Sequence, residues 1–377
     1  MSARAVALEA LLRIEDGAFA NLVTPQLLAQ SDLDDRDRAF VTELVYGTTR
    51  RRRALDWVLD RHTSRPLVEL DADVRNALRL GAYQLLFLKT PPHAAVGETV
   101  DLVPRRAGGL VNAVLRKVAQ TKTVGWPDPP TRLSYPDWIV ERLAADLGPD
   151  TALAALEQMN EPATPTIRDD GYVQDRASQL VAEHVDAQRG ELVLDLAAAP
   201  GGKTTAMAHS GAHVVAVDVN ETRARLVAHN ARRVGVAADV HVVVADGTHP
   251  PFRPHSFDRV LVDAPCTGLG VLRRRPDARW RVEPDDVDAL AAIQRQLLDA
   301  AIPLLKPGGT LVYSVCTLTA AETAGIDEWL RTDHPEIRVA DAPAHEPWEP
   351  SGRGARILPQ TAGTDGMFVL AGTLHPS

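Results

Sequence analysis

The only two cysteines of this 377-residue chain, Cys266 and Cys316, each follow a segment that the sequence predicts to be a β-strand. Cys316 follows the apolar run 311–315, which a proline-glycine turn at 307–309 introduces. An isolated cysteine is usually a small buried apolar residue, whereas its thiolate is a nucleophile. Because both cysteines are predicted at the ends of neighbouring strands, a common chemical role is a better interpretation than two separate buried apolar residues.

The elements that position these cysteines are short β-branched runs that alternate with helix-length segments from residue 190 onward. The runs lie at 191–197, 213–219, 239–246, 258–265 and 310–315. This alternation predicts βαβ units and a mostly parallel sheet that is covered on both faces. Ligands of such sheets bind beyond the carboxyl ends of the strands, where both cysteines fall.

The other strand ends carry residues suited to a nucleoside cofactor. Asp218 ends the second run, where a carboxylate can bind ribose hydroxyls, and Asp246 ends the third, where it can accept from an adenine amino group. The first run leads into a loop of small residues, after which a helix is expected to begin near Thr204. The loop is formed by Ala197, Ala198, Ala199, Pro200, Gly201 and Gly202. The loop lacks the G-x-G-x-x-G spacing, so S-adenosylmethionine fits better than NAD. A phosphate-binding loop at "GGKT" is the alternative.

Residues 1 to about 120 are predicted to be helical only, with apolar residues at helical spacing in 3–14, 36–62, 71–88 and 109–120. Asp71 is the expected N-cap of the third helix. A stretch rich in proline and glycine, 121–138, cannot continue a helix and marks a boundary. Two short helices are expected in 138–160, followed by an irregular joint at 161–175. We therefore predict three parts: 1–125, 126–189 and 190–377.

Composition and charge limit the class of protein. The chain is 45% hydrophobic and 24% charged, with no apolar window near the roughly 20 residues of a membrane span. Two cysteines without zinc-ligand spacing favour a reduced, cytoplasmic and metal-free protein, which we expect to be a monomer. The net charge of −9 is uneven, since residues 1–135 hold 19 basic and 16 acidic residues against 22 and 34 in the rest.

Arginines are clustered, and local clusters rather than net charge make a phosphate-binding surface. The run 50–53 is expected to be a solvated helix face. A second cluster follows the motif that contains Cys266 and comprises Arg273, Arg274, Arg275 and Arg279.

Three motifs together resemble a known family. "DLAAAPGGKT" (195–204), "DAPCTGLGVLRRRPD" (263–277) and "LLKPGGTLVYSVCT" (304–317) are similar to the signatures of the Sun/Fmu, RsmB-type RNA cytosine-C5 methyltransferases. Segments 39–60 and 109–119 resemble that family's NusB-like RNA-binding domain, and 357–374 resembles its final hairpin. The resemblance implies a multidomain protein, with an all-α NusB-like N-terminal domain and an α/β Rossmann-like class I S-adenosylmethionine-dependent methyltransferase domain.

The resemblance also implies roles for individual residues. Cys316 would add to C6 of cytosine and so make C5 nucleophilic toward the methyl group. Asp263 would hydrogen-bond the base at N3 and its amino group, Cys266 would aid release of the methylated product, and Lys203 would help hold the thiolate. Residues 197–203, Asp218, Asp246 and Asp263 would bind S-adenosylmethionine.

The implied substrate is RNA, whose target base must leave its stack to reach the thiol. Arg273, Arg274, Arg275 and Arg279 would contact its phosphates, so affinity should fall with salt. We expect methylation of small-subunit (16S) rRNA, without membrane or metal partners. Alternatives are tRNA or another rRNA, or a non-catalytic RNA-binding assembly factor. N-methylation of a base would need an Asn/Asp-Pro-Pro-aromatic strand end, and Asp263-Ala-Pro-Cys is not one.

The chain departs from the family pattern in a few places. Val315 and Thr317 flank the nucleophile where the family has Thr and Ser, and Ala197 replaces a common cysteine. The family inserts a longer stretch where only residues 169–172 separate Arg168 from Val173. The small RNA-binding subdomain formed by that stretch is therefore expected to be reduced.

Overall fold

The computed structural model describes residues 1–340, 343 and 345–375. The chain forms two compact units, one comprising Met1–Glu141 with Arg274–Arg281 and the other Arg142–Arg273 with Val282–Ser377. The first unit therefore takes a short segment from late in the sequence. The division into domains 1–125, 126–189 and 190–377 stays a prediction.

The first unit contains only helices as regular elements in residues 1–141 and 274–281. Buried leucines such as Leu11, Leu44, Leu78 and Leu115 form its core. The segment 36–62 is split in two at Arg51, and two helices that the sequence analysis did not predict are present at 20–29 and 92–100. The helices are α1 (Ala3–Glu15), α2 (Ala20–Ala29), α3 (Asp35–Arg50), α4 (Arg52–Asp60), α5 (Ala72–Leu86), α6 (Pro92–Val100), α7 (Arg105–Ala119) and α8 (Pro129–Leu133), with short 3₁₀ turns at Leu67–Glu69 and Ala278–Trp280.

Side-chain caps explain where some of these helices begin. Ser2 accepts from the Ala5 amide at the start of α1, and Asp34 accepts from the Asp37 amide at the start of α3. Asp71 does precede α5 as predicted, but its side chain makes no cap hydrogen bond. Its carboxylate lies instead 3.6 Å from a guanidinium nitrogen of Arg106.

The segment 274–281 is anchored in the helical unit by Arg279. This side chain is fully buried, and its guanidinium donates to the backbone carbonyls of Arg50 and Ser134 at 3.2 Å each. Its Cζ atom lies 3.9 Å from the centre of the Tyr135 ring. Burial lowers the pKa of Arg279 to about 10, which is still well above neutral pH.

The arginine run 50–53 is not the solvated helix face that the sequence indicated. Arg50 is 4% exposed at the end of α3, and Arg51, Arg52 and Arg53 are half-buried. Arg53 donates to the carbonyl of Tyr135 and to the carboxylate of Asp137, at 2.8 Å each. The arginines of this run therefore pack within the helical unit and do not form a solvent-exposed surface.

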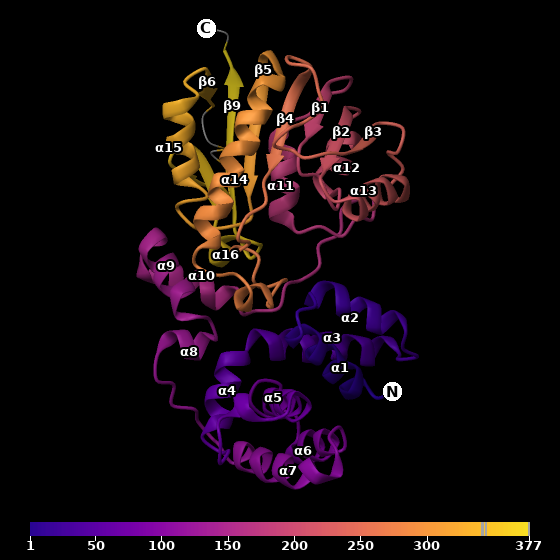
Figure 1. Cartoon of the computed structure of the whole chain (residues 1–377), viewed down its shortest axis with the longest axis vertical. Coiled ribbons are helices and arrows are strands. Elements are labelled where there is room, and N and C mark those ends of the chain that lie inside the picture. The colour runs from indigo at the N-terminus through magenta and orange to yellow at the C-terminus, as the bar shows by residue number, and fades with distance from the viewer. Residues whose placement is uncertain (341–342, 344, 376–377) are drawn as a thin grey trace. The chain divides into compact units, whose positions relative to one another are not determined.

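The second unit is built on a mixed sheet with the strand order β3-β2-β1-β4-β5-β9-β8-β7 and with β6 beside β9 (Figure 1). The first five strands in this order are parallel, as predicted, and β9 runs antiparallel to β5. The strands are β1 (Leu192–Asp195), β2 (His213–Asp218), β3 (Val240–Val244), β4 (Phe257–Asp263), β5 (Leu305–Val315), β6 (Ile337–Val339), β7 (Glu349–Ser351), β8 (Gly354–Ile357) and β9 (Met367–Leu374).

Helices cover both faces of this sheet (Figure 1). Alternate residues of β4 point to opposite faces, so Leu261 joins one core cluster while Val260 and Val262 join the other. The first cluster includes residues of α11 (Arg176–Val185), α12 (Gly202–His209) and α13 (Glu221–Arg233), and the second includes residues of α14 (Asp286–Ala301) and α15 (Ala324–Asp333). This double burial explains the continuous apolar runs in the sequence.

The remaining helices are α9 (Asp137–Leu147) and α10 (Pro149–Gln158), which match the two short helices expected in 138–160, the 3₁₀ turn Ile302–Leu304, and α16 (Pro359–Ala362). The stretch 121–138 is less irregular than predicted, because α8 lies inside it. Among the described residues no helix is long and apolar enough to cross a membrane.

Replacing Arg279 tests whether this side chain holds the segment 274–281 in the helical unit. Arg279→Ala should lower the free energy of unfolding by about 3 to 5 kcal/mol, because it leaves a cavity beside Tyr135 and two buried carbonyls without donors. Urea unfolding measures this loss. Arg275→Ala, an exposed arginine of the same segment, is the control, and equal stability of the two variants would contradict the assignment.

Candidate active site

The carboxyl ends of β1, β4 and β5 meet at one edge of the sheet because these neighbouring strands are parallel. Asp195 and Asp263 are the last residues of β1 and β4, and Asp263 lies in register with Ser314 of β5. Cys316 follows β5 directly, and Cys266 lies three residues beyond the end of β4. The sheet thus brings the predicted catalytic residues to one place.

Lys203 and Asp263 form the charged centre of this edge. The Lys203 Nζ atom donates to Asp263 Oδ2 at 2.7 Å, and the Ser314 hydroxyl donates to Oδ1 at 2.7 Å. Lys203 is 8% exposed. Burial alone would lower the Lys203 pKa, but the contact with Asp263 reverses that effect and raises it, so Lys203 is charged at neutral pH.

The two cysteines are free thiols whose Sγ atoms lie 3.3 Å apart. Both side chains are partly exposed. The pKa of Cys266 is raised well above its usual value, chiefly by the hydrogen bond to Cys316, then by burial and by the charge of Cys316. Cys266 therefore keeps its proton and can donate it toward the sulfur of Cys316.

A buried glutamate that the sequence analysis missed ties the two cysteine loops together. Glu322 is fully buried and accepts from the amide of Thr267 at 2.9 Å and from its hydroxyl at 2.6 Å. It also accepts from the hydroxyls of Thr317 and Thr319 and from the amide of Gln294. Thr267 and Thr317 each follow a cysteine, so Glu322 fixes the backbone beside both sulfur atoms.

Asp195 is the second missed residue. It is 1% exposed, and its Oδ2 atom accepts from the Thr204 hydroxyl at 2.6 Å, whereas Oδ1 has no hydrogen-bond partner among the described residues. Burial raises its pKa to about 7, despite the Thr204 hydrogen bond. A buried carboxyl oxygen without a partner at this edge offers an acceptor to a ligand.

The loop after β1 approaches a ligand with its backbone, as the small residues predicted. Gly201 has a φ of 99°, which favours glycine, and α12 begins at Gly202, two residues earlier than expected. Ala198 is buried, whereas Ala197, Ala199 and Pro200 are more accessible. The free amides at the start of α12 face this edge, where an anionic or polar group can bind.

The short joint at 161–175 folds against this loop. Ile167 and Val173 form an isolated antiparallel bridge, and Arg168 donates to the carbonyl of Gly202 at 2.6 Å. A Cβ atom added to Gly202 would lie 3.0 Å from Gln174. The joint is therefore irregular, as predicted, but it is ordered around the start of α12.

Asp218 and Asp246 lie at the ends of β2 and β3 but in different environments. Asp218 is 4% exposed and accepts from the Asn220 amide at 2.9 Å. Asp246 is exposed and accepts from the amide and hydroxyl of Thr248. These hydrogen bonds lower the Asp246 pKa. Their roles in cofactor binding stay predictions.

Two of the four arginines expected to contact RNA are unsuited to that role in this structure. Arg279 is buried as described above, and Arg273 is 6% exposed and donates to the carbonyls of Gly363, Thr364 and Pro162. Both were expected on the surface because arginine is charged. The backbone carbonyls that bind them come together only on folding, so the sequence does not reveal these partners. Arg274 and Arg275 are exposed, and their contact with RNA stays a prediction.

Comparison with known proteins shows which family this chain belongs to. Residues 182–371 match the family model described as 16S rRNA methyltransferase RsmB/F, and residues 1–120 match the NusB family. The chain belongs to the RsmB/F methyltransferase family. Its fold is accordingly a helical NusB domain and a Rossmann-like, S-adenosylmethionine-dependent methyltransferase domain.

Relatives in this family match nearly the whole chain. A protein of Thermus thermophilus named ribosomal RNA small subunit methyltransferase B is 38% identical, covering 97% of this chain and 96% of the relative. A Mycobacterium tuberculosis protein named as a methyltransferase is 38% identical over 443 aligned positions, covering 98% of this chain and 96% of the relative. That alignment is longer than the 377 residues of this chain, so the relative has residues without a counterpart here.

Solved structures agree on the fold. PH0851 matches with a TM-score of 0.82 over 98% of both chains, at 23% identity. NSun6 from Pyrococcus horikoshii, solved with the S-adenosylmethionine analogue SFG, is 30% identical with a TM-score of 0.50, covering 55% of this chain and 53% of that one. The site fits such a cofactor, because the loop 197–202, the unpartnered oxygen of Asp195 and the carboxylate of Asp218 meet at one edge.

Substituting Glu322 tests whether it positions the two cysteine loops. Glu322→Gln should lower methyl transfer about 10- to 100-fold with little change in S-adenosylmethionine affinity, because an amide cannot accept from every group that Glu322 binds. Turnover and calorimetric cofactor binding are the two measurements. Glu328→Gln on α15, where Glu328 is exposed, is the control. Parallel losses of cofactor binding and turnover would contradict a positioning role.

Asp195 should make stability depend on pH. Between about pH 4 and pH 7 the folded protein keeps a proton on Asp195 that the unfolded chain releases, so this group lowers the free energy of unfolding as pH rises, by about 4 kcal/mol in total. Asp195→Asn removes this effect and should gain stability relative to wild type over that range. Urea unfolding without cofactor measures it. Asp333→Asn, an exposed carboxylate, is the control, and a constant difference for Asp195→Asn would refute the assignment.

Proposed function

We propose that this protein methylates C5 of a cytosine in RNA, most specifically in 16S rRNA, through a covalent bond between Cys316 and C6 of the base. The observation that carries the proposal is the 3.3 Å contact between Cys266 and Cys316 beside the Lys203–Asp263 ion pair. S-adenosylmethionine would supply the methyl group as an electrophilic sulfonium. The residues of the chain provide the remaining functions.

Activation of the base needs a nucleophile and a group that holds the pyrimidine. Addition of the Cys316 thiolate to C6 breaks the ring's aromaticity and makes C5 an enamine carbon, which takes the methyl group. Cys316 is the better candidate for the thiolate, because the raised pKa of Cys266 keeps the proton on Cys266. Asp263, held by Lys203 and Ser314, would accept a hydrogen bond from the amino group of the base and from N3 once N3 is protonated in the adduct.

The same contact suggests how the product is released. After methyl transfer, the proton at C5 must leave before the bond between sulfur and C6 can break and return Cys316 as a thiolate. Once Cys316 is bonded to carbon, its hydrogen bond and charge no longer raise the Cys266 pKa, whereas burial and the charge of Glu322 still do. After Cys266 has released its proton to solvent, its thiolate can accept the proton from C5.

The assignment of 16S rRNA rests on the matched family model and on the NusB domain. The same chemistry on tRNA or another rRNA is the alternative, as is an assembly factor that binds RNA without turnover. The exposed Arg274 and Arg275 are proposed to contact RNA phosphates. The short joint at 161–175 is the part of the chain that bears most on the choice of RNA.

A test of both cysteines uses deproteinised 16S rRNA from cells that lack this protein. Wild-type protein with S-adenosylmethionine should form 5-methylcytidine, measured by nucleoside mass spectrometry, and Cys316→Ala should form none. Cys266→Ala should accumulate a protein–RNA adduct that survives a denaturing gel, since Cys316 attacks but elimination is slow. The double variant should form no adduct.

Calorimetric binding of S-adenosylmethionine to each variant shows that the site is still folded. Formation of 5-methylcytidine by Cys316→Ala would exclude Cys316 as the nucleophile. Cofactor binding without product on 16S rRNA, but with product on tRNA or another rRNA, would support the first alternative. No product on any RNA would favour the assembly factor.

A further inference from the structure

The helical unit contains a cavity of about 250 Å³ that the proposed methyl transfer does not use. This volume is slightly below the 300–1,000 Å³ that is common for small-molecule sites. Its lining combines apolar and charged side chains with buried hydroxyls, and every lining residue belongs to the helical unit: Leu11, Ile14, Glu15, Gly17, Thr48, Thr49, Arg52, Asn76, Arg79, Asp277, Trp280 and Arg281.

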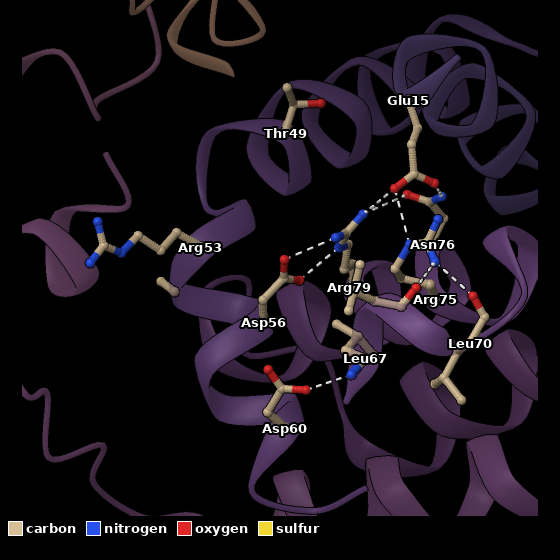
Figure 2. A network of polar contacts seen from close by, with 12 residues as sticks. Glu15, Thr49, Arg53, Asp56, Asp60, Leu67, Leu70, Arg75, Asn76 and Arg79 are labelled. Atoms are coloured by element: carbon tan, nitrogen blue, oxygen red, sulfur yellow. Dashed lines mark hydrogen bonds and ion pairs between the residues drawn. The ribbon is translucent and has the colours of Figure 1, made fainter. Parts of the chain in front are cut away.

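One wall of the cavity is internally neutralised. Arg79 donates to the carboxylates of Asp56 and Glu15, and Glu15 also accepts from Arg75 and Asn76 (Figure 2). These contacts hold the Glu15 pKa at about 2, although burial acts in the opposite direction. This wall is a rigid frame whose charges are already paired.

Another part of the lining has acceptors without donors. Asp277 Oδ1, Thr48 Oγ1 and Thr49 Oγ1 are buried atoms without a hydrogen-bond partner among the described residues, and these residues are 3%, 1% and 5% exposed. The other oxygen of Asp277 is engaged by Arg281 Nε at 3.2 Å and by the Ala20 amide at 3.4 Å. Unpaired buried oxygens are costly, so three of them around one cavity indicate a polar occupant.

Arg52 supplies a cation without a direct partner, since the carboxylates of Asp56 and Glu15 act on it only through longer-range attraction. Within the described chain it makes no hydrogen bond or ion pair, and its Cζ atom lies 5.5 Å from the centre of the Trp280 ring. Arg52 is half-buried, and this burial lowers its pKa from the usual value. A half-buried cation without a direct partner, facing a cavity, favours an anionic ligand.

Trp280 adds a flat apolar surface. Its Nε1 atom donates to the carbonyl of Thr49 at 2.8 Å, which fixes the ring in the lining. Leu11 and Ile14 of α1 supply further apolar surface. The ligand therefore has three requirements: an anionic group for Arg52, a hydrogen-bond donor for Asp277 and a planar ring that can lie against Trp280.

We propose that this cavity binds one nucleotide unit, with its phosphate on Arg52 and an exocyclic amino group of its base on Asp277 Oδ1. Other small anions can satisfy Arg52, but a nucleobase also provides the planar ring and the donor. The choice of a nucleotide rests on the proposed action on RNA. The nucleotide can be a free monophosphate or part of an RNA strand, because both present the same groups.

Calorimetric titration tests the site with two pairs of ligands that differ only by deamination. Adenosine and cytidine monophosphates should bind more tightly than inosine and uridine monophosphates, because only the first of each pair carries the amino group. Asp277→Asn should abolish this preference, because donors hold the Oδ2 position and the amide nitrogen would then replace the Oδ1 acceptor. Arg52→Gln should weaken all four ligands about tenfold or more.

Controls separate this site from general attraction of phosphate. Arg36→Gln, an exposed arginine on α3, removes the same charge elsewhere in the helical unit and should leave affinity within about twofold. Thermal melting of Arg52→Gln and Asp277→Asn identifies any loss of folding. Inorganic phosphate should bind more weakly than the amino nucleotides and should not respond to Asp277→Asn.

The source of the nucleotide is distinguished by repeating the titration with five-residue oligoadenylate. If only the affinity for the oligonucleotide depends on Arg52 and Asp277, the site binds a nucleotide of an RNA strand. If the affinity for the monophosphates depends on them, the site binds a free nucleotide. No binding of either probe, or binding unaffected by both substitutions, would overturn the proposal and leave a cavity that holds only water.

Failure of this proposal is distinguishable from failure of the proposed methylation. All titrations use the full chain carrying Cys316→Ala and no S-adenosylmethionine, so they do not depend on turnover. Loss of 5-methylcytidine formation with intact nucleotide binding would refute only the proposed reaction. Normal methylation by a protein that binds no nucleotide at this cavity would refute only the site proposed here.

Discussion

The ion pair between Lys203 and Asp263 determines the geometry of the catalytic edge. It joins the first turn of α12 to the end of β4, and Ser314 extends the contact to β5. A buried lysine without a carboxylate nearby would tend to lose its proton. Asp263 therefore keeps Lys203 charged, and the parallel pairing of β1, β4 and β5 makes their meeting possible.

Glu322 positions the two cysteine loops as the Lys203–Asp263 ion pair positions the ends of α12 and β4. Its two oxygens collect donors from both cysteine loops and from α14, so a single buried group sets the spacing between two segments that are 50 residues apart in sequence. A 3.3 Å contact between two reactive thiols depends on backbone positions that neither cysteine controls. The positions of the residues proposed for catalysis therefore depend on buried threonines, a glutamine and a glutamate next to them.

The sequence predicts the sheet and its catalytic edge well, because strand periodicity is local and parallel strands must end together. The meeting of Cys266, Cys316 and Asp263 at one edge could be predicted for that reason, whereas their catalytic roles and that of Lys203 come from the family resemblance and stay predictions. Glu322, Asp195 and Arg279 show the limit. Their environments are made by residues distant in sequence, so a glutamate in a turn and an arginine in a basic run look like surface residues. α2 lacks a side-chain cap hydrogen bond and contains Pro25, which obscures its helical pattern.

Residues 274–281 of the helical unit are synthesised long after residues 1–141. Residues 1–141 emerge first, but their unit is completed only by 274–281, whose Arg279 fills the space beside Tyr135. The nascent helices must therefore wait, with the carbonyls of Arg50 and Ser134 lacking the Arg279 guanidinium, until the first four parallel strands of the other unit have been translated. The helical unit is therefore translated first but cannot complete its folding first. A gene fragment that ends at residue 141 encodes this unit without its segment 274–281.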